Sequence, residues 1–351
     1  MIDGGDERDT YTLTESFFDR QAFQGAVVNL ATGTATDSWG GTDTLVSIER
    51  VEGSRFADQF TGSDANDRFA GLKGRDTIDG GAGWDTVNYD RDADYGGLRG
   101  VNVNLATGVA RDGWGQIDTL VSIESVRATG FNDTLVGNDQ ENWLHGGAGV
   151  DVINGGAGTD TVDFWNDLVT AGAVVNLGRT NGQVRNDGFG NVETLRGIEN
   201  LYGTFRNDNL TGNAGANWLE GDFGSDTLSG GGGADVLVGG DGEDRMTGGA
   251  GADSFRFNRW DGGTPWGDTI TDFQSGTDRL TFDTDDFAGM GTTLRFRNGN
   301  AAGTVGESWF YFNTATDQLF WDADGIGGDG AVLVATLTGV NTLSGGDFEL
   351  L

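Results

Sequence analysis

The sequence predicts an all-β protein: a parallel β-roll or β-helix solenoid of nonapeptide repeats, with a β-rich cap at its C-terminal end. The first observation is a nine-residue phrase, repeated fourteen times, whose sixth residue is Asp or Asn and whose eighth is apolar. The second is a longer unit of 75 residues that contains these phrases and recurs through the chain. A disordered Gly-rich linker would have no reason to keep a large apolar residue two places after every acid.

Each nonapeptide predicts one tight turn followed by one short strand. Its glycines allow the positive φ angles of a tight turn, and the triplet around the eighth residue is long enough for a strand that points this residue inward. Two nonapeptides then form one coil of a flattened solenoid, and successive coils stack about 4.8 Å apart. Clear copies are Gly80–Asn88, Gly155–Asp163 and Gly248–Arg256.

The repeats divide the chain into five expected segments. Each 75-residue unit opens with alternating apolar residues, which favour strands that continue the solenoid as extra coils or hairpins. Residues 1–12 match the end of an array, which predicts a longer parent protein, with a degenerate N-terminal cap as the alternative. The expected boundaries are the end of a truncated array at 1–12, unit 1 at 13–88 (nonapeptides 53–88), unit 2 at 89–163 (nonapeptides 128–163), unit 3 at 164–256 (nonapeptides 203–256) and a capping region at 257–351.

The sixth residues are candidate metal ligands, because stacking places each one against the residue 18 positions away. Two carboxylates about 5 Å apart repel by about 0.8 kcal/mol even in water. A hard divalent cation between the turns converts that repulsion into ligation by carboxylate and carbonyl oxygens, the donor set that calcium prefers. Counting stacked pairs predicts about eight calcium ions. The candidate side chains are Asp58, Asp67, Asp76, Asp85, Asp133, Asn142, Asp151, Asp160, Asp208, Asn217, Asp226, Asp235, Asp244 and Asp253.

The turn glycines are candidate ligands through their backbone carbonyls, since they expose the chain at each turn. They are Gly81, Gly83, Gly147, Gly149, Gly156, Gly158, Gly231, Gly233, Gly240, Gly242, Gly249 and Gly251. Asn142 and Asn217 keep a carbonyl donor without the charge, which predicts weaker or shared sites. The first turn of each array lacks consensus glycines, and a purely structural role is left open for it.

Composition excludes several partners. The formal charge of −34 disfavours nucleic acid and anionic membranes, and it favours cations. We expect the chain to be largely unfolded without calcium and to fold on binding it. The sequence has no Cys, no N-terminal signal peptide and no apolar run long enough for a membrane span.

The arrays resemble the RTX (repeats-in-toxin, hemolysin-type) calcium-binding family, whose nonapeptide they match. The phrase Asp268-Thr-Ile-Thr-Asp272-Phe273 is similar to the segment that closes the roll of serralysin-like and large RTX proteins. This resemblance implies that Asp268 and Asp272 hold a terminal calcium. It also implies a secreted, extracellular bacterial protein, exported by the type I secretion machinery without an N-terminal signal. The tail resembles an uncleaved C-terminal secretion signal made of Asp347, Phe348, Glu349, Leu350 and Leu351.

No catalytic constellation is expected in this chain. The only His is His145, so an HExxH zinc site cannot form, and GxSxG is absent. The favoured function is a non-catalytic, calcium-dependent folding and secretion module, or a surface or adhesion protein made of such modules. The alternative is the C-terminal tail of a secreted RTX enzyme (a serralysin-like metalloprotease, a lipase or an alginate epimerase). A polysaccharide or cell-surface ligand is left open.

Overall fold

The chain forms two compact units built almost entirely of short β-strands. The computed structural model describes residues 1–6, 8–257, 267–283, 294–299, 309–322 and 331–351. One unit comprises Met1–Asp163 with Asn191–Ile198, and the other comprises Phe164–Gly190 with Glu199–Leu351. The described helices are three 3-10 turns: η1 (Thr14–Phe17), η2 (Asp92–Tyr95) and η3 (Gly345–Asp347). None of these has the length and apolarity needed to cross a membrane. The predicted all-β fold class is confirmed.

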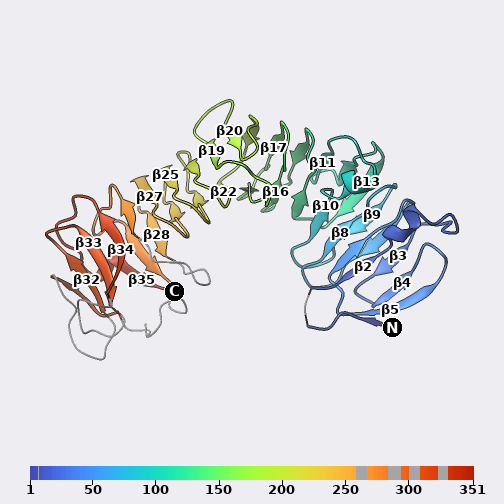
Figure 1. Cartoon of the computed structure of the whole chain (residues 1–351), viewed down its shortest axis with the longest axis horizontal. Helices are drawn as coiled ribbons and strands as arrows, with labels where there is room; N and C mark the ends of the chain where they lie inside the picture. Colours follow the sequence, from blue (N-terminus) through green and yellow to red (C-terminus); the bar gives the residue numbers. More distant parts are fainter. Residues whose placement is uncertain (7, 258–266, 284–293, 300–308, 323–330) are drawn as a thin grey trace. The chain divides into compact units, whose positions relative to one another are not determined.

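The first unit contains a twelve-stranded sheet and a second run of strands (Figure 1). In spatial order the twelve strands are β1 (Ile2–Asp3), β5 (Thr42–Val46), β4 (Thr34–Thr36), β3 (Val27–Asn29), β7 (Gln59–Thr61), β9 (Thr77–Asp79), β13 (Ile117–Val121), β12 (Val109–Arg111), β11 (Asn102–Asn104), β15 (Thr134–Val136), β17 (Val152–Asn154) and β21 (Thr194–Arg196). The second run is β2 (Thr10–Thr12), β6 (Arg50–Glu52), β8 (Arg68–Ala70), β10 (Thr86–Asn88), β14 (Ser125–Arg127), β16 (Trp143–His145) and β18 (Thr161–Asp163).

The second unit has a ten-stranded sheet and a run of six strands. The ten are β20 (Val184–Asp187), β19 (Ala173–Asn176), β23 (Asn209–Thr211), β25 (Thr227–Gly232), β27 (Arg245–Ala250), β29 (Asp268–Ile270), β34 (Val332–Leu337), β33 (Gln318–Asp322), β32 (Trp309–Asn313) and β31 (Phe296–Asn298). The six are β22 (Asn200–Tyr202), β24 (Trp218–Glu220), β26 (Val236–Val238), β28 (Ser254–Phe257), β30 (Arg279–Phe282) and β35 (Phe348–Leu350).

Strands of successive coils pair in parallel at the register that the repeat predicts. Phe60 lies opposite Ile78, and Leu144 lies opposite Val162. All fourteen eighth-position residues are buried, with no side chain more than 1% exposed. They are Phe60, Phe69, Ile78, Val87, Leu135, Leu144, Ile153, Val162, Leu210, Leu219, Leu228, Leu237, Met246 and Phe255. The stacked apolar column is therefore the core of each unit, and it fixes the turns on the two edges.

The longer repeat adds antiparallel hairpins to this parallel stack. In the first unit β3, β4 and β5 form an antiparallel meander, and β11, β12 and β13 form an equivalent one. The Val28–Ala35 pair of the first meander corresponds to the Val103–Ala110 pair of the second. In the second unit β19 and β20 form the equivalent hairpin. The outer strands of both meanders also pair in parallel with neighbouring coils, so the twelve-stranded sheet continues through them, whereas β20 is the end strand of its sheet.

The described C-terminal strands close the second unit. Strands β32, β33 and β34 are antiparallel, and β34 pairs in parallel with β29. The last strand, β35, pairs in parallel with β30, with Phe348 opposite Leu280. The Phe348 ring centroid lies 5.4 Å from that of Phe310, which itself lies 4.5 Å from that of Phe282. The residues expected to form a secretion signal are thus part of the folded cap.

Candidate metal centre

The sixth-position side chains are buried at the turns although nearly all of them carry a carboxylate. None of the fourteen is more than 3% exposed. The strands fix this placement, because the apolar eighth residue points into the core and the sixth residue then lies at the corner of the coil. Burying so many ionisable groups is costly unless each one has hydrogen bonds or a cation.

One carboxylate oxygen of each inner turn continues a ladder of hydrogen bonds along the edge. The Asp208 N–H donates to Asp226 Oδ1 at 2.7 Å, and the Asp226 N–H donates to Asp244 Oδ1 at 2.8 Å. On the other edge the Asp235 N–H donates to Asp253 Oδ1 at 3.0 Å. The first unit repeats this pattern, with Asp58 N–H to Asp76 Oδ1 at 2.8 Å. The ladder fixes where the other oxygen of each carboxylate points.

That other oxygen has no hydrogen-bond partner at several inner turns. Among the described residues, buried side-chain oxygens without a partner include the Oδ2 atoms of Asp76, Asp85, Asp226, Asp235 and Asp244. Asp67 Oδ1 is also without a partner, although Ser63 donates two hydrogen bonds to its Oδ2. Burial raises the pKa of Asp226 to about 8, and the neighbouring carboxylates of Asp208 and Asp244 contribute in the same direction. Burial likewise raises the pKa of Asp76 to about 10. An ionised carboxylate in this position requires a cation.

The glycines open the turns toward the same place. All twelve predicted glycines have φ between +83° and +151°, where residues with a Cβ are disfavoured. A Cβ on Gly249 or Gly251 would collide with the carbonyl oxygens of Gly231 and Gly233, respectively. Carbonyl groups of one turn therefore stack directly under the glycines of the next. Side chains are excluded from this stack, and the carbonyl oxygens line the edge.

These donors fit calcium. No group of three or more His, Cys, Asp or Glu side chains converges on a metal position within the described ranges. Asp76, Asp85, Asp226, Asp235 and Asp244 each offer one unpartnered carboxylate oxygen at the edge along which the carbonyls stack. A set of hard oxygen donors dominated by carbonyls suits calcium, whereas zinc prefers nitrogen and sulfur ligands in a tetrahedron.

The opening turns of the arrays differ from the inner turns. Asp58 Oδ1 accepts from the Ala26 N–H at 2.6 Å and from Ser54 Oγ at 2.8 Å, and its Oδ2 accepts from the Ser54 N–H at 2.7 Å. The protein thus uses both oxygens. Asp133 and Asp208 make equivalent bonds to Thr129 and Thr204.

The two asparagines also have protein partners. Asn217 Oδ1 accepts from the Asn213 N–H at 2.8 Å, while its amide nitrogen donates to the Glu199 carbonyl at 2.7 Å. Asn142 does the same with the Asn138 N–H at 2.7 Å and the Glu124 carbonyl at 3.3 Å. An amide N–H therefore occupies the side of the carbonyl that a cation would otherwise face.

Sequence reasoning missed several acids that extend the ladders. The Asp76 N–H donates to Asp118 Oδ1 at 3.0 Å, and the Asp85 N–H donates to Glu124 Oε2 at 2.9 Å. The Asp253 N–H donates to Asp278 Oδ1 at 3.1 Å. Asp118 and Glu124 recur at the 75-residue step, as Asp43 with Glu193 and as Glu49 with Glu199. That periodicity was the signal that could have revealed them.

The two acids of the closing segment lie in different environments. Asp268 joins a ladder, since its Oδ1 accepts from the Asp244 N–H at 3.0 Å. Burial raises its pKa well above the ordinary value, and the carboxylate of Asp244 adds to this. Asp272 instead accepts from the N–H groups of Gly248 and Gly249, at 3.0 and 2.9 Å. Asp268 therefore resembles an inner-turn ligand, whereas Asp272 stabilises a turn through hydrogen bonds.

Residues outside the turns that sequence analysis singled out are also buried. Asp347 is fully buried and accepts from Ser275 Oγ at 2.7 Å and from the Gly276 N–H at 2.8 Å. His145 lies on the outer face of β16 but is only 3% exposed. Its Nδ1 lies 3.8 Å from Asp163 Oδ2, and burial lowers its pKa. A covered imidazole beside a carboxylate is a structural pair in this sheet.

Comparison with known proteins agrees with this geometry. The family described as RTX calcium-binding nonapeptide repeat (4 copies) matches residues 49–95, 127–162, 194–228 and 220–255. No curated protein matches the chain. Among solved structures, the AlgE6R3 subunit of the Azotobacter vinelandii mannuronan C5-epimerase is 30% identical, covering 41% of this chain and 77% of its own, with a TM-score of 0.29. The extracellular lipase LipA from Serratia marcescens is 19% identical, covering 84% of this chain and 40% of its own, with a TM-score of 0.27.

Proposed function

Since the chain carries RTX calcium-binding nonapeptide repeats, we propose that it is a calcium-dependent folding module without catalytic activity, which acquires its structure after type I secretion. The observation that carries the proposal is the set of buried inner-turn carboxylate oxygens without a protein partner. Calcium at these oxygens would remove the cost of the buried charges and hold neighbouring coils together. Binding free energy then becomes folding free energy.

The ions would sit at the inner turns rather than at every turn. Asp76, Asp85, Asp226, Asp235 and Asp244 each offer an unpartnered oxygen. The opening-turn acids would be structural, because their oxygens already accept hydrogen bonds. Asn142 and Asn217 would replace a cation with an amide donor. Asp268 would extend the third array by one further ligand.

The C-terminal residues would serve export and folding in succession. In a calcium-poor cytosol the charge of −34 opposes compaction, so the tail would stay extended and available to a type I transporter. After export Phe348–Leu350 would pair with β30 and complete the cap. The C-terminal segment would therefore be exported first and would add the last strand of the sheet.

Calcium titration tests the proposal. Metal-free protein is expected to be mostly disordered by far-UV circular dichroism, and calcium is expected to produce a cooperative β signal, at about 10⁻⁴ to 10⁻³ M as in extracellular modules. Magnesium is the control, since its strict octahedral geometry suits carbonyl-rich turns poorly. A chain that keeps its full β signal in excess chelator would contradict the proposal.

A further inference from the structure

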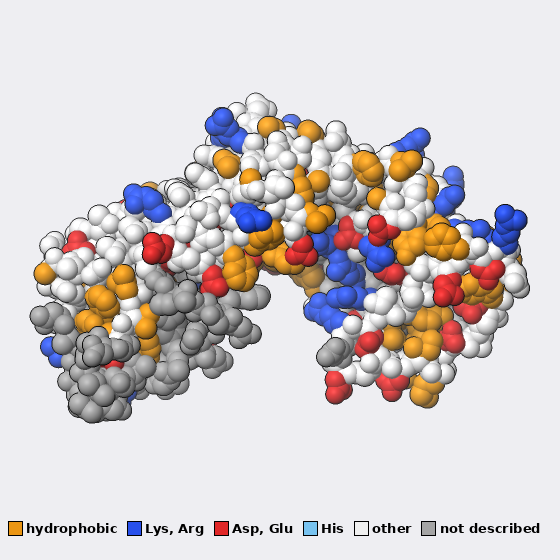
Figure 2. All heavy atoms as spheres, in the orientation of Figure 1, with side chains coloured by type: hydrophobic (Ala, Val, Ile, Leu, Met, Phe, Trp, Pro, Cys, Tyr) orange, Lys and Arg blue, Asp and Glu red, His pale blue; other side chains and the backbone are white. Residues whose placement is uncertain are grey.

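Arginines gather on the outer face of the first unit, although the chain is strongly acidic. Arg50 on β6 and Arg68 on β8 are direct partners in the parallel register, and Arg127 follows on β14. Figure 2 shows cationic side chains collected in one patch on the unit that carries β8 and β10. Only 21 of the 351 residues are Lys or Arg, so such a cluster is costly and unexpected. Like charges directly opposite each other in a sheet are destabilising.

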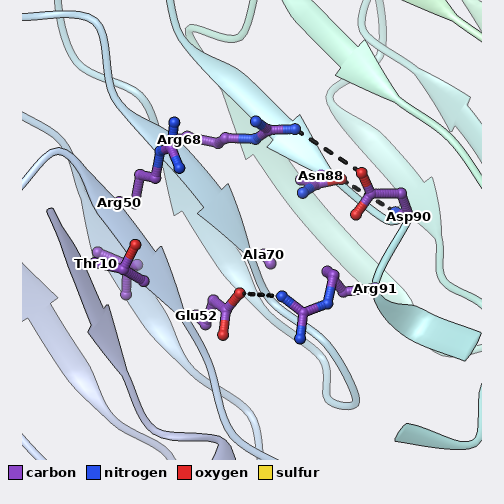
Figure 3. Close-up of a pocket in the computed structure, with 9 residues that line it drawn as sticks. Thr10, Arg50, Glu52, Arg68, Ala70, Asn88, Asp90 and Arg91 are labelled. Carbon is purple, nitrogen blue, oxygen red and sulfur yellow. Dashed lines mark hydrogen bonds and ion pairs between the residues drawn. The ribbon is translucent and has the colours of Figure 1, made fainter. Parts of the chain in front are cut away.

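The cluster is only partly neutralised by the protein. Arg91 is paired, with Glu52 at 2.8 Å and Asp94 at 2.7 Å. Arg68 lies 3.9 Å from Asp90, at the limit of an ion pair, and its buried Nε has no hydrogen-bond partner among the described residues. Burial lowers the pKa of Arg68, and the nearby Arg127 and Arg50 lower it further. In Figure 3 the Arg50 guanidinium lies beside the pocket without any bond to the residues drawn.

Two hollows share the Arg50–Arg68 pair. The larger, of about 220 Å³, is also lined by Thr10, Asn88 and Asp90. The smaller, of about 140 Å³, is lined by Asn66, Thr86 and Trp84, whose side chain is 36% exposed. The two guanidinium groups thus lie between two hollows, which are lined by hydroxyl, amide, carboxylate and indole groups.

We propose that this face binds an acidic polysaccharide chain, with Arg50 and Arg68 taking the carboxylates of adjacent sugar residues. A guanidinium pairs with a carboxylate through two parallel N–H donors. The hydroxyl and amide groups of Thr10, Thr86 and Asn66 suit sugar hydroxyls, and the exposed Trp84 ring offers an apolar surface for a sugar face.

The mixed lining of the hollows favours this ligand over nucleic acid. Asp90 and Glu52 lie in the same hollow as the arginines, and the whole chain carries −34. These carboxylates repel any polyanion, but they can also accept hydrogen bonds, and a DNA phosphate backbone offers them no donor. A uronic acid chain carries hydroxyl groups beside each carboxylate, which match the mixed lining of arginine, carboxylate, amide and hydroxyl groups. The position is particular to the first array, since Trp143 and Trp218 replace Arg68 at the 75-residue step.

Binding of tetragalacturonate to the calcium-folded full chain, measured by isothermal titration calorimetry, tests the proposal. We expect saturable binding that weakens with salt, and about tenfold or greater loss of affinity in Arg50→Gln and in Arg68→Gln. Arg185→Gln is the matched control, because it removes the same charge from an exposed site on β20 of the other unit. Neutral maltotetraose, free galacturonate and single-stranded DNA serve as probes of the competing ligand classes.

The binding measurements either support or overturn the uronate site. Loss of affinity confined to the Arg50 and Arg68 variants supports the site, and so does tetragalacturonate binding that exceeds that of DNA. Equal affinity in all variants, equal binding of maltotetraose, or retention of free galacturonate or DNA alone would overturn it. Circular dichroism in calcium verifies that each variant is folded. If Arg68→Gln fails to fold, Arg50→Gln still carries the test, because the Arg50 guanidinium forms no hydrogen bond or ion pair with the residues drawn around the hollow. A wild-type protein that folds with calcium yet binds no uronate would reject this site and leave the calcium module intact.

Discussion

Asp208 and Asp226 occupy the same place in successive coils of one edge, yet the protein treats their carboxylates differently. Asp208 opens the third array and accepts from the Thr204 N–H at 2.7 Å and from Thr204 Oγ1 at 2.9 Å. Asp226, one coil later, follows a glycine-containing turn without a hydroxyl at the equivalent position, and its Oδ2 has no partner among the described residues. In this pair the residue four places before the acid decides whether both carboxylate oxygens have protein partners. At Asp67 both bonds from Ser63 go to Oδ2, so Oδ1 stays without a partner among the described residues.

This comparison separates two functions that the sequence repeat presents as one. An opening turn lies between a hairpin strand and the next coil, as β7 lies between β3 and β9, and there Ser or Thr supplies the hydrogen bonds. An inner turn lies between two coils and can share an ion with its neighbour. Folding would then depend on calcium only where one nonapeptide turn stacks on another, while the opening turns anchor each array.

The largest expected effects come from substituting Ala for Asp226 and, separately, for Asp208. Asp226→Ala should remove at least one bound calcium ion and shift the calcium midpoint of folding upward by about tenfold or more. Asp208→Ala should keep the ion count of the wild type and lower the unfolding free energy by about 1–3 kcal/mol, since it leaves buried N–H groups unpaired. Calcium stoichiometry by calorimetry and urea unfolding in saturating calcium measure the two effects. Equal ion loss in both variants would contradict the division of roles.

The fold was predictable because its signals are local and periodic. The spacing of Asp226 and Leu228 determines the coil, and the 18-residue step determines the register of Leu228 with Met246. The calcium set was predictable only in part. Whether an oxygen of the sixth-position side chain has a partner depends on residues of the same turn, such as Thr204 and Asn213. The hydrogen-bond ladder also includes Asp118, 42 residues beyond Asp76, and the nonapeptide pattern does not contain this residue.

Asn217→Asp sharpens the comparison from the opposite direction. The substitution removes the amide that donates to the Glu199 carbonyl at 2.7 Å and adds a carboxylate oxygen in its place. We expect one additional calcium ion per chain and a fold that depends more steeply on calcium concentration. The number of calcium ions bound is measured by calorimetry. Asn213→Asp is the control, because it adds the same charge to the turn without changing the sixth-position residue. An unchanged ion count would show that the asparagine does not stand in for a cation.

Proton binding should partly replace calcium. Burial raises the pKa of Asp226 to about 8 and that of Asp208 to about 6, both above the ordinary value of 3.8. A group whose folded pKa is raised stabilises the fold fully below its unfolded pKa, and this contribution is lost as pH rises through the folded pKa. In metal-free buffer we therefore expect more β signal near pH 5 than near pH 8. Greater structure at the higher pH would show that the inner carboxylates are not buried without the ion.

The smallest effect concerns Asp347, which extends the opening-turn behaviour to the end of the chain. Its oxygens accept from Ser275 Oγ and from the Gly276 and Ser344 N–H groups, at 2.7, 2.8 and 2.7 Å. Although burial opposes it, these hydrogen bonds lower its pKa, in contrast to the raised pKa of Asp226. Asp347→Ala should therefore leave the calcium stoichiometry unchanged and lower the unfolding free energy in calcium by about 1 kcal/mol, because the turn donors are close enough to the surface for water to replace the carboxylate.

Glu349→Ala is the control for Asp347→Ala, since this exposed side chain on β35 should change neither the ion count nor stability. Urea unfolding in saturating calcium, together with calorimetry, distinguishes the roles. A lost calcium ion in Asp347→Ala would make the tail part of the metal-binding edge. An unchanged free energy of unfolding would mean that β35 pairs with β30 without help from Asp347, and the tail would then act chiefly in export.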